Sequence, residues 1–118
     1  MSSPVQDAVF HSALELWKRD TVLYSDPARI VDHPGFRAIT AMGNEAVVPL
    51  LEELAEFPWI GICAALVVTT GAILDIAEED YGKIPVMAQA WLDWGHDNGH
   101  LRTLQYHRLV ATLEENTK

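Results

Sequence analysis

The sequence predicts an all-α protein, a single domain over residues 1–118 built as a compact bundle of about five to six short helices. Apolar residues recur at three- and four-residue intervals, which places them on one face of a helix, and no stretch alternates as a strand does. Prolines and glycines lie where these helices would begin and end. With 49% hydrophobic and 21% charged residues, the composition is that of a globular chain rather than a disordered one.

Three prolines, each preceded by a residue that can cap a helix, mark helix starts in the N-terminal third. The expected elements are a helix over residues 4 to about 19, one short turn at 28–31, and a helix from 34 that ends at Gly43. Ser3 is the expected N-cap of the first helix, and Gln6 occupies the position of its capping-box partner.

The next helix separates its apolar residues from its acids. Its core face carries apolar residues at positions i, i+3, i+4 and i+7, namely Val47, Leu50, Leu51 and Leu54. Its other side carries Glu45, Glu52, Glu53 and Glu56. Asn44 is the expected N-cap, and Pro49, which lies beyond the first turn, predicts an irregular start or a bend.

The most apolar part of the chain, residues 57–74, contains no charged residue. Such a run is either a membrane span or a helix buried on all sides. Pro58 would begin a helix and Gly71 would end it, which leaves about thirteen residues where a span needs roughly twenty. The flanking residues, Glu56 and Asp75, also lack the basic anchors of a span. The sequence therefore predicts a buried central helix around which the others pack.

A loop at about residues 72–82 and two more helices complete the chain. The first of these helices has one apolar face, made of Ile84, Met87, Ala88 and Trp91, and should end at Trp94-Gly95. Residues 96–99 form a turn. The last helix repeats the apolar interval at Tyr106, Leu109, Val110 and Leu113, and is expected to fray from Glu114 onward.

Charge limits the classes of partner. Eight Lys and Arg residues against seventeen Asp and Glu residues give a net charge of −9, which disfavours nucleic acids and anionic membranes as ligands. Between residues 38 and 82 there is no Lys, Arg or His. An acidic surface in this region could attract a basic protein, although solubility alone would also account for it. The candidate partner-binding residues are Glu52, Glu53, Glu56, Asp75, Glu78, Glu79, Asp80, Tyr81 and Trp94.

No catalytic or cofactor-binding residue is predicted, because the chain lacks a nucleophile elbow, a phosphate-binding glycine loop and a metalloprotease motif. His96 and His100 could share a metal only on a continuous helix, which Asn98 and Gly99 make improbable, so a turn with exposed histidines is expected. The acids at 75–80 do not have the spacing of an EF-hand loop. The single cysteine, Cys63, is expected to pack as a small apolar side chain.

Several motifs between residues 33 and 95 together resemble a group of small bacterial proteins with a HEAT-like helical fold and no established activity. They are His33-Pro34-Gly35-Phe36, Met42-Gly43, Pro49-Leu50-Leu51, Ala65-Leu66, Thr70-Gly71 and Ala90-Trp91-Leu92-Asp93-Trp94-Gly95. The resemblance implies an α-α superhelix with a HEAT-like helix pair at about residues 34–71. It carries no catalytic residue. This chain differs at residues 72–77, which are apolar where the group has a proline-rich link.

The first functional hypothesis is a non-enzymatic protein-interaction domain that binds a basic protein through an acidic face. A sharper form is an immunity- or antitoxin-like inhibitor of a basic toxin. A different class, a metal-dependent hydrolase using the carboxylates or His96 and His100, remains a second hypothesis. Exposure of Ile73, Leu74 and Ile76 would favour a homodimer. Because the N-terminus lacks the basic start and apolar segment of a signal peptide, a cytoplasmic location is expected.

Overall fold

Seven α-helices and two short 3-10 helices make up the part of the chain that a computed structural model describes, residues 4–24 and 26–117. The α-helices are α1 (Pro4–Thr21), α2 (Pro27–Val31), α3 (Pro34–Ala41), α4 (Val47–Glu56), α5 (Ile60–Thr70), α6 (Ile84–Asp97) and α7 (Thr103–Asn116). The 3-10 helices are η1 (Gly43–Ala46) and η2 (Glu78–Asp80). Residues 4–24 and 26–117 contain no strand, and the predicted all-α class is confirmed. The predicted capping of the first helix by Ser3 and Gln6 concerns a residue and a side chain that lie outside the described part of the structure.

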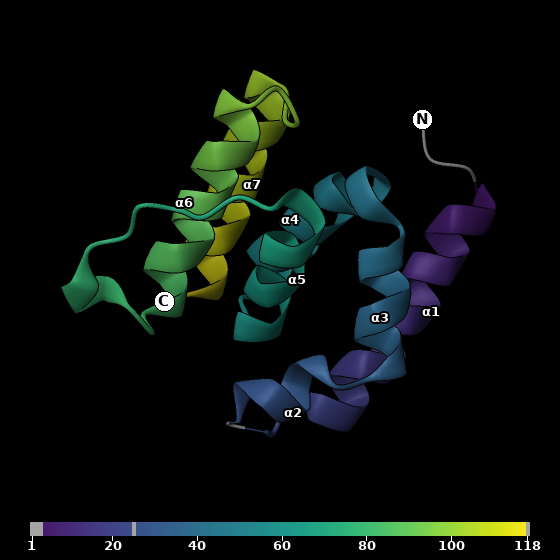
Figure 1. Cartoon of the computed structure of the whole chain (residues 1–118). Helices are drawn as coiled ribbons and strands as arrows, with labels where there is room; N and C mark the ends of the chain where they lie inside the picture. The colour runs from purple at the N-terminus through teal and green to yellow at the C-terminus, as the bar shows by residue number, and fades with distance from the viewer. Residues whose placement is uncertain (1–3, 25, 118) are drawn as a thin grey trace.

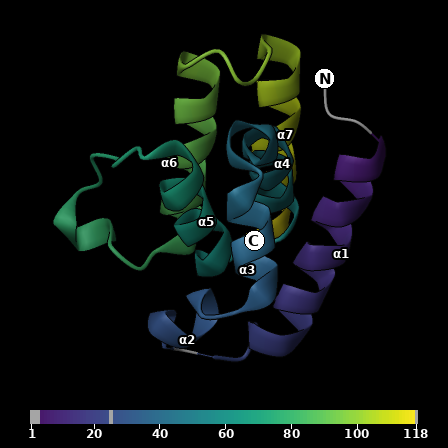
Figure 2. The same ribbon diagram turned by 45° about the vertical axis from the view of Figure 1, so that its right-hand side comes forward.

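The helices pack in three layers (Figures 1 and 2). Helices α4 and α5 contact each other and form the middle layer. On one side α5 contacts α2 and α3, and α3 packs along α1. On the other side α4 contacts both α6 and α7, which also pack against each other. The two outer pairs are thus held together by the middle pair, whose buried side chains form the centre of the core.

Helix α5 is less enclosed than the sequence predicts. Ile62, Ala65 and Leu66 are fully buried, but Val67 and Val68 are 43% and 57% exposed. The expectation of burial on all sides is therefore wrong, because the neighbouring helices leave the last turns of α5 open on one side. The helix has 11 residues, and none of the helices described is long and apolar enough to cross a membrane. Gly71 ends α5 with a left-handed φ of 70°, as predicted.

The start of α5 differs from the prediction by two residues. Pro58 was expected to begin the helix, yet Trp59 has an extended backbone (φ −146°, ψ 137°) and the helix begins at Ile60. The indole of Trp59 folds back over Gly61, where a Cβ atom would lie 2.7 Å from the ring. The same ring packs against Trp17 of α1 with a centroid separation of 4.5 Å. Tertiary packing of this tryptophan therefore decides where the helix starts.

Helix α6 continues past the glycine that was expected to end it. Gly95 lies inside the helix and is buried at the contact with α4. A Cβ atom at Gly95 would lie 2.6 Å from Cδ1 of Leu51. This glycine therefore permits a close helix–helix approach rather than a helix end. The chain turns only at Asn98-Gly99, where Gly99 has a φ of 80°.

Two further predictions at helix ends need correction. The irregular start before Pro49 is confirmed as η1, but Asn44 makes no side-chain capping bond to η1 or α4. Helix α7 does not fray from Glu114, because it continues to Asn116. The side-chain amide of Asn116 donates a hydrogen bond of 3.2 Å to the carbonyl of Ala55 in α4. This long-range bond joins the last turn of α7 to α4.

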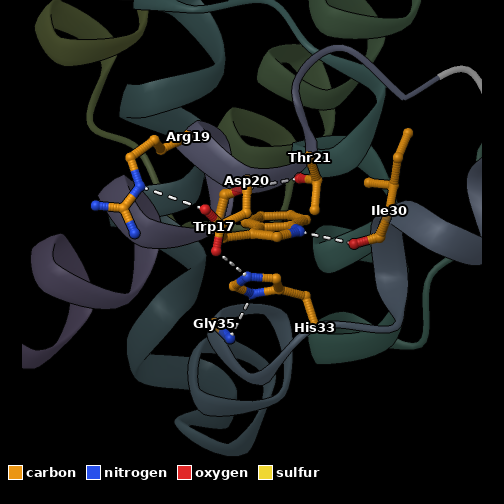
Figure 3. Close-up of polar contacts among 7 residues, drawn as sticks. All are labelled: Trp17, Arg19, Asp20, Thr21, Ile30, His33 and Gly35. Atoms are coloured by element: carbon orange, nitrogen blue, oxygen red, sulfur yellow. Dashed lines mark hydrogen bonds and ion pairs between the residues drawn. The ribbon is translucent and has the colours of Figure 1, made fainter.

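A set of polar contacts joins α1 to the end of α2 and the start of α3 (Figure 3). The indole N–H of Trp17 donates to the carbonyl oxygen of Ile30 at 2.8 Å. His33 is the N-cap of α3, and its Nδ1 accepts the backbone N–H of Gly35 at 2.9 Å. Nδ1 therefore carries no proton, so Nε2–H donates to Oδ2 of Asp20 at 2.9 Å. The imidazole thus links α1 to α3 through both of its nitrogens.

The contact between His33 and Asp20 predicts a pH dependence of stability. The hydrogen bond from His33 lowers the pKa of the Asp20 carboxyl, and Arg19 adds to this effect. Because the pKa is lower in the folded than in the unfolded state, the carboxylate stabilises the fold above about pH 4 and loses this contribution as the pH falls further. Asp20→Asn should therefore lower the free energy of unfolding at neutral pH, and the difference should shrink in acid. Urea denaturation at a series of pH values from neutral to acid measures this difference in the free energy of unfolding. A difference that does not change with pH would contradict the stabilising role of the Asp20 carboxylate.

Candidate functional site

A hollow on the surface lies between α1 and the segment η1–α4, with a volume of about 710 Å³. Helix α1 supplies Asp7, Phe10 and His11 to its lining, and η1–α4 supplies Asn44, Glu45, Val48, Pro49, Glu52, Glu53 and Glu56. We call this hollow the acidic groove, because five of its lining residues are carboxylates. In Figures 1 and 2, α1 lies along the outside of the molecule.

Helix periodicity explains why polar side chains meet here. The face of α4 opposite its buried leucines carries Glu52, Glu53 and Glu56, as the sequence predicts. On α1, Asp7 and His11 are exposed and lie four residues apart, so they belong to one polar stripe. The fold places the polar stripe of α1 opposite the acidic face of α4. That juxtaposition joins residues far apart in the chain and could not be inferred from either stripe alone.

One carboxylate of the acidic groove is already neutralised within the chain. Nζ of Lys18 in α1 lies 2.7 Å from Oε1 of Glu53 in α4, and the two side chains are 20% and 19% exposed. Lys18 also lies 3.6 Å from Oε1 of Glu15 and 4.5 Å above the ring of Phe57. This ion pair ties α1 to α4 beside the groove. Glu53 therefore has an intramolecular partner.

The other carboxylates of the groove are less compensated. Oε2 of Glu52 lies 4.0 Å from Nη2 of Arg108, at the limit of an ion pair. Within the described part of the chain, no Lys, Arg or His nitrogen lies within 4.0 Å of the carboxylates of Asp7, Glu45 or Glu56. The groove thus concentrates negative charge over a lining that includes the apolar side chains of Val48 and Pro49.

The remaining predicted acids lie in a different part of the molecule. Asp75, Glu78, Glu79, Asp80 and Tyr81 belong to the connection between α5 and α6, which projects on the side away from α1 (Figures 1 and 2). All but Asp80 are exposed, and Asp80 lies 3.3 Å from Nζ of Lys83. The structure therefore divides the predicted acidic residues into two separate groups.

Trp94 belongs to a third region, the end of α6 beside the start of α7. Its ring stacks on His100 with a centroid separation of 5.0 Å, and the ring of His96 stacks on Tyr106 at 4.6 Å. The two histidines thus pack on different aromatic partners. Among residues 4–24 and 26–117, no group of three or more His, Cys, Asp or Glu residues is placed to hold a metal ion. The proposed histidine metal site gains no support from this geometry.

Tyr106 makes a contact that sequence reasoning missed. Its hydroxyl donates a hydrogen bond to the Asp93 carboxylate, which joins α7 to α6. This bond is the main cause that raises the pKa of Tyr106 above its ordinary value. Gln89 also donates to the same carboxylate oxygen, at 2.8 Å. The Tyr106 bond thus joins α7 to α6, whereas the Gln89 bond lies within α6.

Cys63 is not a nucleophile in the folded protein. Its side chain is buried in α5, and burial raises the pKa of the thiol to about 12. At about pH 8 only on the order of one thiol in ten thousand is then ionised. Iodoacetamide should therefore leave Cys63 unmodified in the native protein and alkylate it after denaturation in urea, as mass spectrometry would show. Rapid labelling under native conditions would contradict this.

Sequence reasoning identified only part of the acidic groove, the acids Glu52, Glu53 and Glu56 of α4. Asp7, His11 and Glu45 were not among the predicted partner-binding residues. Their helical spacing marks them as one face of each helix, but only the packing of α1 beside α4 makes them neighbours. Comparisons with known proteins add no further residue: no protein-family model matches the chain, and no curated protein or solved structure is significantly similar to it.

Proposed function

We propose that this chain is a non-enzymatic protein-interaction domain and that the acidic groove binds a basic segment of another protein. The observation that carries the proposal is the groove between α1 and α4, in which Asp7, Glu45 and Glu56 have no cationic neighbour among the described residues. A concave site lined by one sign of charge raises the local concentration of oppositely charged ligands and favours their association.

The Lys18 contact supports the chemistry of such binding. A lysine ammonium group lies against the Glu53 carboxylate and over the Phe57 ring, in a partly buried position beside the groove. A carboxylate and an aromatic ring are the two groups that attract a cation most strongly in this setting. A lysine or arginine of a partner would meet carboxylates of the same kind at Glu52 and Glu56, with the apolar surface of Val48 beneath its alkyl chain.

The stacked arrangement of helix pairs supports a HEAT-like description as part of the same proposal. Helices α4 and α5 contact each other, and they contact α2 and α3 on one side and α6 and α7 on the other. Repeat proteins of this kind stack helix pairs so that each contacts its neighbours, and they use the resulting surfaces for binding. Under this proposal residues 34–71 contain the central pair, and the groove lies at its junction with α1.

A sharper form of the proposal is an immunity- or antitoxin-like inhibitor that covers a basic toxin. The net charge of −9 and the acid-lined groove are compatible with it. The two forms of the proposal differ in what binding does to the partner. Only an inhibitor would abolish an activity of the protein that it binds.

Charge reversal within the groove tests the proposal. Immobilised protein should retain a basic protein from an extract of its own cells at low salt, and added salt should release it because exposed charges are screened. Glu45→Lys/Glu56→Lys should weaken retention by about tenfold or more. Asp97→Lys/Glu115→Lys changes the net charge equally on exposed residues outside the groove, and should retain the partner. Equal losses in the two variants, or no retained protein at low salt, would contradict the proposal.

A further inference from the structure

The connection between α5 and η2 contains a segment without helix or turn, residues 72–77, which we call the strap. Its side chains alternate in exposure: Ala72 and Leu74 pack against the core, whereas Ile73 is 92% exposed and Asp75 is also exposed. The strap contains no helical turn or bend, and in Figures 1 and 2 it runs from α5 to η2 as a single thread. Alternating burial without a turn is the pattern of a β-strand that lies on a core.

The backbone of the strap is bonded at its ends and open in its middle. The N–H of Gly71 donates to Val67 at 2.8 Å, and the N–H of Ala72 donates to the hydroxyl of Thr70 at 3.0 Å. At the other end the carbonyl of Ala77 accepts from Asp80 at 2.9 Å. No hydrogen bond within residues 4–24 and 26–117 involves the backbone N–H or C=O groups of residues 73–76. A strand-like segment with both edges unpaired is therefore available at the surface.

We propose that the strap takes up an extended segment of a basic protein as an added β-strand. Unpaired N–H and C=O groups in an extended segment form a template for another strand, and such pairing is a common mode of peptide recognition. Ile73 offers apolar surface to the alkyl chain of one basic side chain of the incoming strand, and Asp75 offers a negative charge to the next basic side chain, two residues later.

Charge selects a basic occupant rather than a second copy of the chain. Beyond Asp75, the exposed side chains of Glu78 and Glu79 follow directly, and Lys83, the nearest basic residue along the sequence, lies 3.3 Å from Asp80. A second copy of the chain carries the same net charge of −9 and would bring further negative charge to this acidic surface, which disfavours it as the occupant. A strand with lysine or arginine at alternate positions would complement them. This inference does not depend on the acidic groove, which lies on the side of α1.

A defined peptide tests the inference with the full chain. The probe is an acetylated and amidated heptapeptide of alternating lysine and valine, and the control is the same peptide N-methylated at every residue, which keeps the charge and removes the donors. The first peptide should slow amide hydrogen exchange at residues 73–76 and should bind on the order of tenfold more tightly than the control. Equal binding of the two peptides, or no binding of the first, would overturn the proposal.

Two proline variants identify the edge that pairs. Backbone groups of residues 73 and 75 point to one edge of a strand and those of residues 74 and 76 to the other. Ile73→Pro and Ile76→Pro each remove one donor, while Ile73→Thr and Ile76→Thr keep the N–H and the β-branched shape. The proline variant at the edge that pairs with the peptide should bind it about tenfold more weakly than the threonine variant at the same position. Circular dichroism checks that each variant remains folded.

The remaining outcomes separate the alternatives. If neither proline variant binds more weakly than its threonine control, the strap does not pair and the proposal fails. If sedimentation shows a dimer whose strap amides are protected without peptide, the occupant is a second copy, and the basic partner is excluded. Glu45→Lys/Glu56→Lys should leave peptide protection at the strap unchanged, because those residues lie in the acidic groove. This variant distinguishes a failure of the strap from a failure of the groove.

Discussion

Replacing Trp17 with alanine should lower the free energy of unfolding by about 4 kcal/mol, which is a large fraction of the stability of an ordinary domain. The side chain is fully buried, packs against the rings of Trp59 and Phe36, and donates its indole N–H to Ile30. Its loss would create a cavity between α1, α3 and the start of α5 and would leave the Ile30 carbonyl without its donor. Chemical denaturation monitored by circular dichroism would measure the change.

Two companion variants separate packing from hydrogen bonding. Trp17→Phe keeps an aromatic ring and removes the donor, so it should lower the free energy of unfolding by about 1–3 kcal/mol. Leu104→Ala removes a large apolar side chain that is 85% exposed, and should change stability by no more than about 0.5 kcal/mol. If Trp17→Ala were no more destabilising than Leu104→Ala, the central role of this tryptophan would be disproved.

Gly35→Ala should lower the free energy of unfolding by about 3 kcal/mol, although it adds only one methyl group. A Cβ atom at Gly35 would lie 2.6 Å from the backbone oxygen of Ala13 and 2.8 Å from Cβ of Trp17. Both are atoms that a rotamer change cannot move, so α3 would have to shift away from α1. The shift would also strain the bond from the Gly35 N–H to His33. Denaturation curves would measure the loss.

Gly99→Ala is the matched control for this substitution. Gly99 has a φ of 80°, and a Cβ atom there would meet nothing within 4 Å. The substitution therefore carries only the backbone strain of a left-handed residue, about 1 kcal/mol. A larger loss for Gly99→Ala than for Gly35→Ala would show that close packing of α1 on α3 is not the dominant effect.

The helices could be predicted because their signals are local. Asp26 and His33 each precede a proline and accept a backbone N–H at the start of α2 and α3, and Gly71 takes the left-handed conformation that ends α5. Gly95 shows where this reasoning fails. A glycine can end a helix or allow a close helix contact, and the sequence around it looks the same in both cases. Only the position of Leu51 against α6 decides between them.

The candidate site was predictable in its parts but not as a whole. The acidic face of α4 follows from the spacing of Glu52, Glu53 and Glu56. That Glu53 meets Lys18, 35 residues away, does not follow from any local pattern. The strap shows the same limit: its apolar sequence was recognised as unusual, but its open backbone and the full exposure of Ile73 depend on how α5 and α6 are arranged.

By itself the sequence determined where the helices lie, which face of each is apolar, and that the chain carries a large excess of negative charge. Helix capping and three- and four-residue spacing act over a few residues, so they can be recognised without the fold. Tertiary structure alone decided that α1 faces α4, that Lys18 neutralises Glu53 and that the acids divide between the groove and the strap side. These features depend on how distant helices pack together, because the contacts that create them join residues with no local relation in the chain.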